Sequence, residues 1–369
     1  MNIRKLVAFM AALICFNALA ADEHLNIYNW SDYIADDTIS QFEKKTGIKV
    51  RYDVYDSNDT LQAKLLAGSS GYDIVVPTSN YAGRQLQAQH SNNRRKIYQP
   101  LDKTMLPNLK YLDKNIMDKL AEIDPHNQYA VPWVFGTTGL GYQVEKVQQI
   151  LGKKASLDNW DNLFDPNIIA KLKQCGVSML DAPDQVFAAT LHYMGRNPSS
   201  EKLSDYEDAY LLLKKIRPYI TQFSSSTYIN ELVGGDICFA YGWSGDITIA
   251  KHRARQAKKP YRIHYAIPKG GAPVWFDLMM IPRDAPHSST ALAWINFSQD
   301  PEINAAITNK VFYPSANFAA KKFIQKEVVN DPGVYPPAKV VKTLFPLKSL
   351  SPEITRKITR LWTQFKTGK

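Results

Sequence analysis

This chain of 369 residues has few of the features that mark membrane proteins, metalloproteins and most enzymes. Beyond residue 20 it has no run of eighteen apolar residues, the length that a membrane-spanning helix needs. Its seven histidines never fall at metal-ligand spacing, and it contains no Walker loop, dinucleotide-binding glycine motif, HExxH pair or GxSxG elbow. We therefore expect a soluble mature protein without a metal or a cofactor.

The first twenty residues have the pattern of a secretory signal peptide. Arg4 and Lys5 precede an apolar stretch over residues 6–16, and the small residues at 18–20 fit a cleavage site after Ala20. The apolar stretch is too short to cross a bilayer. The sequence therefore predicts an exported protein.

Cysteine is scarce, with three residues in the chain. Cys15 leaves with the signal peptide, so Cys175 and Cys238 remain. An even pair of cysteines in an oxidising compartment is expected to form a disulfide. Two thiols without an adjacent histidine are a poor metal site.

The formal charge is +10, and the signal peptide contributes +2 of it, which leaves +8 on the mature chain. A basic balance is typical of proteins that bind nucleic acid or anionic surfaces. Here the lysines and arginines are scattered, apart from residues 94–96 and 251–259, and no nucleic-acid-binding motif accompanies them. We expect solvated surface charge and no nucleic acid partner.

Hydrophobic periodicity predicts strands at residues 25–29, 48–54 and 72–76 and helices at 38–45 and 60–67. Strands that alternate with helices indicate an α/β protein with a largely parallel sheet. About 349 mature residues exceed one comfortable core, so two domains are expected.

Two further segments have clear local signals. Residues 89–96 are polar and basic and predict an exposed loop. Ser351-Pro352-Glu353 predicts the start of a last helix. Its apolar positions 354, 358, 361, 362 and 365 have helical spacing and are expected to face the core.

Tryptophan and aspartate occur within three residues of each other in three segments: YNWSDY at 28–33, GWSGD at 242–246 and WFD at 275–277. An aromatic face attracts a cation, and a neighbouring carboxylate hydrogen-bonds to an ammonium group. Three such pairs are able to form a box for a small organic cation. For each pair alone, a core tryptophan beside an aspartate that caps a turn is the favoured explanation.

Two of the polar segments directly follow predicted strands. Trp30-Ser31-Asp32 comes after the strand at 25–29, and Thr78-Ser79-Asn80 comes after the strand at 72–76. In open α/β sheets the ligand lies beyond the carboxyl ends of the strands. This placement favours a binding role for both segments.

The motifs occur in an order that resembles the putrescine- and spermidine-binding periplasmic proteins of ABC importers. The run from YNWSDYI at 28–34 to FEKKTGIKV at 42–50 is similar to the opening of that family. The resemblance continues through LDAP at 180–183, NEL at 230–232, GDIC at 235–238, GWSGD at 242–246, VFY at 311–313 and PGVYPP at 332–337. It covers essentially the whole mature chain.

The resemblance implies an α/β, two-lobed type II periplasmic binding protein fold, in which each lobe is a mixed sheet flanked by helices. Residues 21–134 and 266–310 are expected to form lobe 1, and residues 135–265 and 311–369 lobe 2, with the ligand cleft between them. The implied partners are a polyamine and an inner-membrane ABC permease, and the implied state is a periplasmic monomer. The family also has a disulfide at the positions of Cys175 and Cys238.

The resemblance also assigns roles to side chains. The implied aromatic walls are Trp30, Tyr33, Trp243, Trp275 and Tyr313. The implied ammonium-binding carboxylates are Asp32, Asp246 and Asp277, with Ser31 and Thr78 as polar partners. Methylenes suit aromatic faces, and carboxylates at fixed spacing suit the charges of a polyamine.

Two substituted positions depart from the family pattern. Gln185 stands where putrescine-binding members commonly have an acidic residue, so one ammonium partner is neutral. Trp275 stands where many members have phenylalanine, which enlarges one wall. The class of ligand is therefore better defined than the choice between putrescine and spermidine.

The rival hypothesis is an exported enzyme acting on an amine-bearing substrate, with Asp32 or Asp246 as the acid–base residue. The absence of a nucleophile, metal or cofactor motif favours a receptor. A receptor for another organic cation, or one that reports polyamine to a sensor, is the remaining alternative.

Overall fold

A computed structural model describes residues 24–91 and 96–368. The predicted signal peptide and its cleavage site lie outside the described residues, as do residues 92–95 of the predicted loop. Among the described residues no helix combines the length and the apolar character needed to cross a membrane.

The strands form one mixed sheet in the order β2-β1-β3-β9-β4-β7-β5-β6, with β10 paired to β9 and β8 to β4. Their bounds are β1 His24–Trp30, β2 Lys49–Tyr55, β3 Ile74–Val75, β4 Ala130–Gln143, β5 Val177–Met179, β6 Gln222–Phe223, β7 Phe239–Trp243, β8 Ile263–Ala266, β9 Pro273–Met280 and β10 Phe345–Pro346. The pairs of β1 with β2 and with β3 are parallel, as the alternating pattern predicts.

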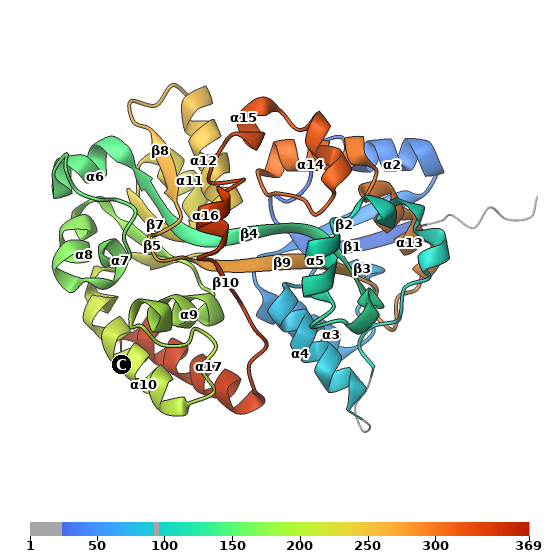
Figure 1. The fold of residues 1–369 in the computed structure, drawn as a ribbon, viewed down its shortest axis with the longest axis horizontal. Coiled ribbons are helices and arrows are strands. Elements are labelled where there is room, and N and C mark those ends of the chain that lie inside the picture. The colour runs from blue at the N-terminus through green and yellow to red at the C-terminus, as the bar shows by residue number, and fades with distance from the viewer. Residues whose placement is uncertain (1–23, 92–95, 369) are drawn as a thin grey trace, which may run out of the picture.

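The long strand β4 connects the two halves of the molecule (Figure 1). Its first part, from Ala130 to Thr137, pairs antiparallel with β9, which also contacts β3. Its second part pairs antiparallel with β7 and β8. A single strand therefore carries the chain from one half of the sheet to the other.

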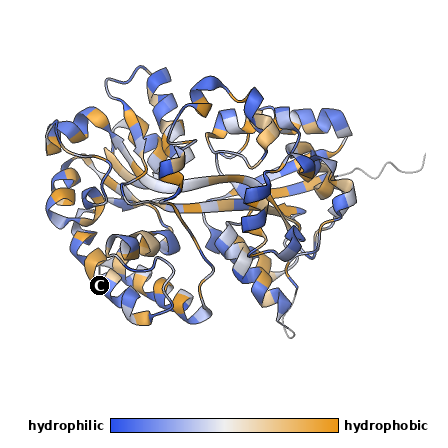
Figure 2. Ribbon diagram, viewed as in Figure 1, coloured by the Kyte–Doolittle hydropathy of each residue, from blue (hydrophilic) through white to orange (hydrophobic). Residues whose placement is uncertain are grey.

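Helices cover both halves of the sheet (Figure 1). The α-helices are α2 Thr38–Thr46, α3 Asn58–Ala67, α4 Ser79–His90, α5 Lys114–Leu120, α6 Val144–Leu151, α7 Asp161–Phe164, α8 Pro166–Leu172, α9 Pro183–Tyr193, α10 Leu203–Ile216, α11 Tyr228–Gly234, α12 Ser244–Gln256, α13 Ser288–Ser298, α14 Pro301–Val311, α15 Lys326–Val329, α16 Ala338–Val341 and α17 Pro352–Thr367. The 3-10 turns are Lys103–Met105, Pro107–Tyr111, Pro125–Asn127, Lys173–Cys175, Arg217–Tyr219 and Phe318–Phe323. Most helices carry both hydrophilic and hydrophobic residues (Figure 2), as expected for helices that pack one face on the core.

Local sequence signals correctly located a helix near each end of the chain. The helix predicted over 38–45 is α2, which ends at Gly47 in a left-handed conformation with φ 79°. The last helix begins at Pro352, where Ser351 accepts a hydrogen bond from the backbone N–H of Ile354. All five of its predicted apolar positions are buried.

Two predictions of local structure need correction. The strand predicted over 72–76 is reduced to β3 Ile74–Val75. The loop predicted from residue 89 begins later, because α4 continues to His90 and Gln89 is buried. The Gln89 Oε1 atom accepts hydrogen bonds from the backbone N–H groups of Ile97 and Tyr98, which explains a buried polar side chain in a polar run.

The fold is therefore α/β with a mixed sheet in two halves, as expected. The hydrophobic core is one large cluster that extends through both halves, with a small second cluster centred on Ala320, Ile324 and Val328. The residue boundaries of the two lobes stay a prediction.

The predicted disulfide between Cys175 and Cys238 is present, with a Cα–Cα distance of 5.5 Å. It joins residues 63 positions apart. Cys175 lies two residues before β5, and Cys238 directly precedes β7, which is the parallel neighbour of β5. The covalent bond therefore ties together two adjacent strands of one half.

Replacing both Cys175 and Cys238 with alanine is expected to lower the free energy of unfolding by about 3–4 kcal/mol. The reason is that the unfolded variant lacks the closed loop that the disulfide imposes on the unfolded wild type. Urea unfolding of the oxidised protein and of the variant measures this. Thiol labelling of the denatured wild-type protein without reductant provides the control. Labelling of both cysteines would contradict the disulfide.

Candidate binding site

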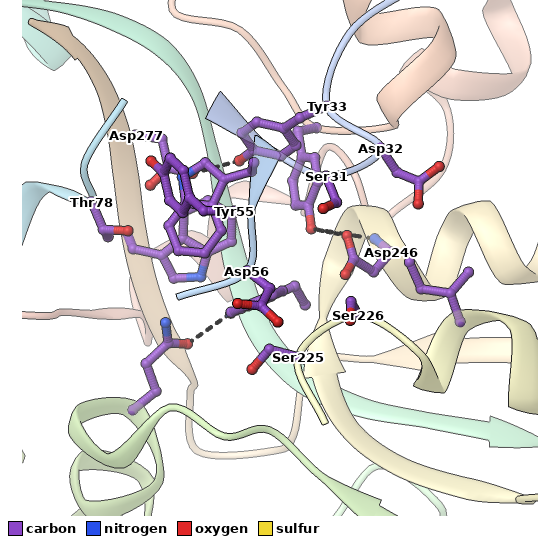
Figure 3. Close-up of a pocket in the computed structure, with 16 residues that line it drawn as sticks. Ser31, Asp32, Tyr33, Tyr55, Asp56, Thr78, Ser225, Ser226, Asp246 and Asp277 are labelled. Atoms are coloured by element: carbon purple, nitrogen blue, oxygen red, sulfur yellow. Dashed lines mark hydrogen bonds between the residues drawn. The ribbon is translucent and has the colours of Figure 1, made fainter. Parts of the chain in front are cut away.

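A pocket lies between the two halves, where strand ends from both meet (Figure 3). The structure brings together around it all the residues that the sequence predicted for a ligand site: Trp30, Ser31, Asp32, Tyr33, Thr78, Gln185, Trp243, Asp246, Trp275, Asp277 and Tyr313. Their part in binding stays a prediction, since proximity alone does not test it.

The fold explains why residues so far apart in the sequence converge. Trp30 is the last residue of β1, and Trp243 is the last residue of β7. Asp246 lies in the first turn of α12, which follows β7 directly. Asp277 lies on β9 and forms an antiparallel backbone bridge with Thr78. The pocket is thus built at strand ends, as the topological argument predicts.

Four aromatic contacts surround the pocket. The ring centroids are 5.7 Å apart for Trp30 and Trp243 and 6.5 Å for Trp243 and Trp275. They are 5.4 Å apart for Trp275 and Tyr313 and 5.2 Å for Tyr313 and Tyr33. All of these rings are buried. They supply faces for methylene groups and for a cation.

Asp277 is 3% exposed and has one satisfied and one unsatisfied oxygen. The Tyr33 hydroxyl donates to Oδ2 at 2.6 Å. Oδ1 is sealed from solvent and has no hydrogen-bond partner among the described residues. Burial raises the pKa of Asp277 to about 7, against the opposing effects of the Tyr33 hydrogen bond and of the nearby Thr78 hydroxyl. A buried carboxylate oxygen without a donor is able to accept a hydrogen bond from a cationic group.

Asp246 is also buried, but two tyrosines hold it. The hydroxyl of Tyr313 donates to Oδ1 at 2.7 Å, and that of Tyr228 donates to Oδ2 at 2.8 Å. Burial raises the pKa of Asp246 to about 6, and the hydrogen bonds from Tyr313 and Tyr228 oppose the increase. The negative charge of Asp246 in turn helps to raise the pKa of Asp277, so the two carboxylates act on one part of the pocket.

Asp32 differs from the other two predicted carboxylates. Its side chain is 47% exposed and forms an ion pair with Arg253 of α12, with a distance of 2.8 Å between Oδ1 and Nη2. Figure 3 places Asp32 at the edge of the group, with its carboxylate pointing away from Asp277. Asp32 and Arg253 come from opposite halves of the molecule. The structure therefore provides Asp32 with a protein cation as its partner.

Five lining residues escaped the sequence analysis, namely Tyr55, Asp56, Ser225, Ser226 and Ile229. Tyr55 ends β2 and Asp56 follows it, so the strand-end argument applied to Trp30 and Thr78 would have found them. The two serines follow β6, a strand of two residues with no periodic signal. Asp56 is exposed and makes no ion pair within the described part of the chain.

The lining is strongly anionic, in contrast to the basic chain. It contains four aspartates, and none of the lining residues is lysine, arginine or histidine. Elsewhere, Asp181 pairs with Lys366 and accepts from the Trp362 indole, while Asp184 accepts from the Asn80 amide at 2.7 Å. Both of these aspartates therefore have partners within the protein. No metal-binding cluster of His, Cys, Asp or Glu is found in residues 24–91 and 96–368.

The fold and the pocket define a class: a two-lobed binding protein with an anionic and aromatic site between its halves. Comparison with known proteins agrees. The profile of the family described as bacterial extracellular solute-binding protein matches residues 37–336. The chain belongs to this family, which consists of solute-binding proteins rather than enzymes. The hypothesis of an exported enzyme is thereby set aside.

Individual relatives cover nearly the whole chain. The chain is 47% identical over 366 residues to the putrescine-binding periplasmic protein PotF of Escherichia coli strain K12, covering 99% of this chain and 97% of that protein. It is 47% identical over 361 residues to the putrescine-binding periplasmic protein SpuD of Pseudomonas aeruginosa strain UCBPP-PA14, covering 98% and 96%.

A solved structure is also similar. The putative spermidine/putrescine ABC transporter from Listeria monocytogenes superposes with a TM-score of 0.82 at 29% identity, covering 94% of this chain and 100% of that one. These similarities confirm the type of fold and the resemblance found in the sequence.

Proposed function

We propose that this protein is a periplasmic receptor that captures a polyamine, putrescine or spermidine, and delivers it to an inner-membrane ABC permease. The relatives that bear the names of putrescine-binding and spermidine/putrescine-binding proteins support the proposal. Export by a signal peptide cleaved after Ala20 and a monomeric state are parts of the same proposal.

The observation that carries the proposal is the unsatisfied Oδ1 atom of Asp277, buried beside Asp246 and among aromatic rings. An ammonium group placed there donates charge-assisted hydrogen bonds to the carboxylate and offsets the cost of burying its charge. The methylenes of a polyamine then lie against Trp30, Trp243 and Trp275. An anionic lining without a basic residue excludes anionic solutes.

Calorimetric titration of refolded, ligand-free mature protein tests the proposal directly. Putrescine, cadaverine, spermidine, spermine and agmatine form the ligand panel, and an amino acid without a second amine serves as the negative control. We expect tight binding of putrescine or spermidine. If none of the panel binds, the polyamine assignment fails and a different organic cation becomes the candidate. If binding is tight but no transport follows when the protein is supplied to cells lacking it, the signalling role is favoured.

A further inference from the structure

The pocket has a second end, formed around Gln185 of α9, whose chemistry differs from that of the aspartates. Gln185 is 3% exposed and lines the pocket. Its Oε1 atom accepts from the Thr138 hydroxyl and, at 3.1 Å, from the Trp243 indole. Because an indole N–H is only a donor, the atom facing it is the carbonyl oxygen, which fixes the orientation of the amide.

The acceptor capacity at this end is therefore already in use. Both lone pairs of the Gln185 carbonyl have protein donors. The Thr138 hydroxyl that donates to it accepts in turn from the Trp275 indole at 3.0 Å. The Nε2 group of Gln185 makes no hydrogen bond within the described residues and is not sealed from solvent. What Gln185 offers to the cavity is a donor.

The neighbouring residue Asp184 does not supply the acceptor that the Gln185 end of the pocket lacks. Asp184 lies next to Gln185 in sequence, but its carboxylate accepts from the Asn80 amide and does not line the pocket. Thr78 at the pocket wall accepts from Asn58 at 2.9 Å, and its hydroxyl lowers the pKa of Asp277, so Thr78 acts near that carboxylate. A second ammonium at Gln185 would meet a donor.

We propose that the Gln185 end receives a neutral oxygen acceptor, so that the pocket takes a primary amine whose far end is a carbonyl or hydroxyl, such as an N-acetylated diamine. The cationic end pairs with Asp277 and Asp246, and the oxygen accepts from Gln185 Nε2. A carboxylate at the far end is excluded because the lining holds four aspartates and no basic residue. This inference rests on the proposed binding of polyamines and extends the ligand class to their singly charged derivatives.

Titration of the mature protein with putrescine, N-acetylputrescine and 4-aminobutan-1-ol tests the proposal. The alcohol matches putrescine in length and replaces one ammonium with a hydroxyl. We expect at least one neutral-ended ligand to bind within tenfold of putrescine. In Gln185→Glu the affinity for putrescine relative to that for each neutral-ended ligand should rise at least tenfold. The reason is that a carboxylate accepts from an ammonium and cannot donate.

Gln174→Glu is the matched control, since it adds the same charge at an exposed position outside the pocket and should leave every ratio unchanged. The Asp56→Asn variant tests the alternative that the exposed carboxylate of Asp56 binds the second ammonium group of putrescine. The proposal is overturned if putrescine binds more than tenfold tighter than both neutral-ended ligands, or if Gln185→Glu leaves the ratio unchanged. If no ligand binds to any variant, the polyamine function itself fails.

Discussion

Asp277→Asn is expected to weaken polyamine binding by at least about thirtyfold. Removal of one partner of a desolvated ion pair costs about 2–5 kcal/mol, and each 1.4 kcal/mol corresponds to a tenfold change in affinity. The asparagine retains the shape of the side chain and an acceptor for the Tyr33 hydroxyl, but it places an N–H donor where Asp277 has the unsatisfied Oδ1. Calorimetric titration with putrescine and spermidine measures the loss.

Asp246→Asn is expected to have a loss of the same order, because Asp246 is buried beside the same part of the pocket. Asp32→Asn is the informative control. Its carboxylate is half exposed and already paired with Arg253, so solvent screens it and its loss should cost less than tenfold. Near-wild-type affinity of both Asp277→Asn and Asp246→Asn would refute the site. A larger loss for Asp32→Asn than for Asp277→Asn would refute the assignment of the charged end.

Polyamine affinity is expected to fall by on the order of a hundredfold to a thousandfold as the pH is lowered from 8 to 5. Burial raises the pKa of Asp277 to about 7 and that of Asp246 to about 6 in the ligand-free protein. Above pH 7 both carboxylates are ionised and attract ammonium groups. As the pH falls through these pKa values, protons occupy the carboxylates and compete with the ligand. The ammonium groups stay protonated over this range, since their pKa values lie near that of lysine.

Titration at several pH values, in pairs of buffers with different ionisation enthalpies, measures both the affinity and the protons released. Near pH 6.5 ligand binding should release protons, because the bound ammonium keeps the carboxylates ionised. The Asp277→Asn variant should release fewer protons than the wild type over the same range. An affinity that stays constant between pH 8 and pH 5 would contradict the shifted pKa values.

Sequence patterns were informative wherever a short segment determines its own structure. The helix start at Ser351, the helix over 38–45 and the apolar spacing of the last helix depend on neighbours within one or two turns, and all three appear as expected. The strand-end rule placed Trp30 and Thr78 at the pocket because sheet topology follows from the alternation of elements. The same rule applied to the end of β2 would have included Tyr55 and Asp56.

Local patterns were insufficient where distant residues decide. Gln89 reads as part of a polar loop, yet it is buried because its amide oxygen satisfies the backbone of Ile97 and Tyr98. Asp32 reads as a partner of a ligand cation because it lies beside Trp30. Its observed partner, Arg253, is 221 positions away, and nothing in the local pattern indicates that pair.

The sequence by itself determined the class of fold, the pair of cysteines and the set of side chains that could form an aromatic and anionic site. Tertiary structure alone decided the state of each group in that site. It left the Oδ1 of Asp277 without a donor, held Asp246 with two tyrosines and occupied the carbonyl of Gln185 with Thr138 and Trp243. Residue identity sets which hydrogen bonds a side chain is able to make. Its burial and its partners depend on long-range packing. Burial and partners together set the charge of the side chain and which of its donors or acceptors are left for a ligand.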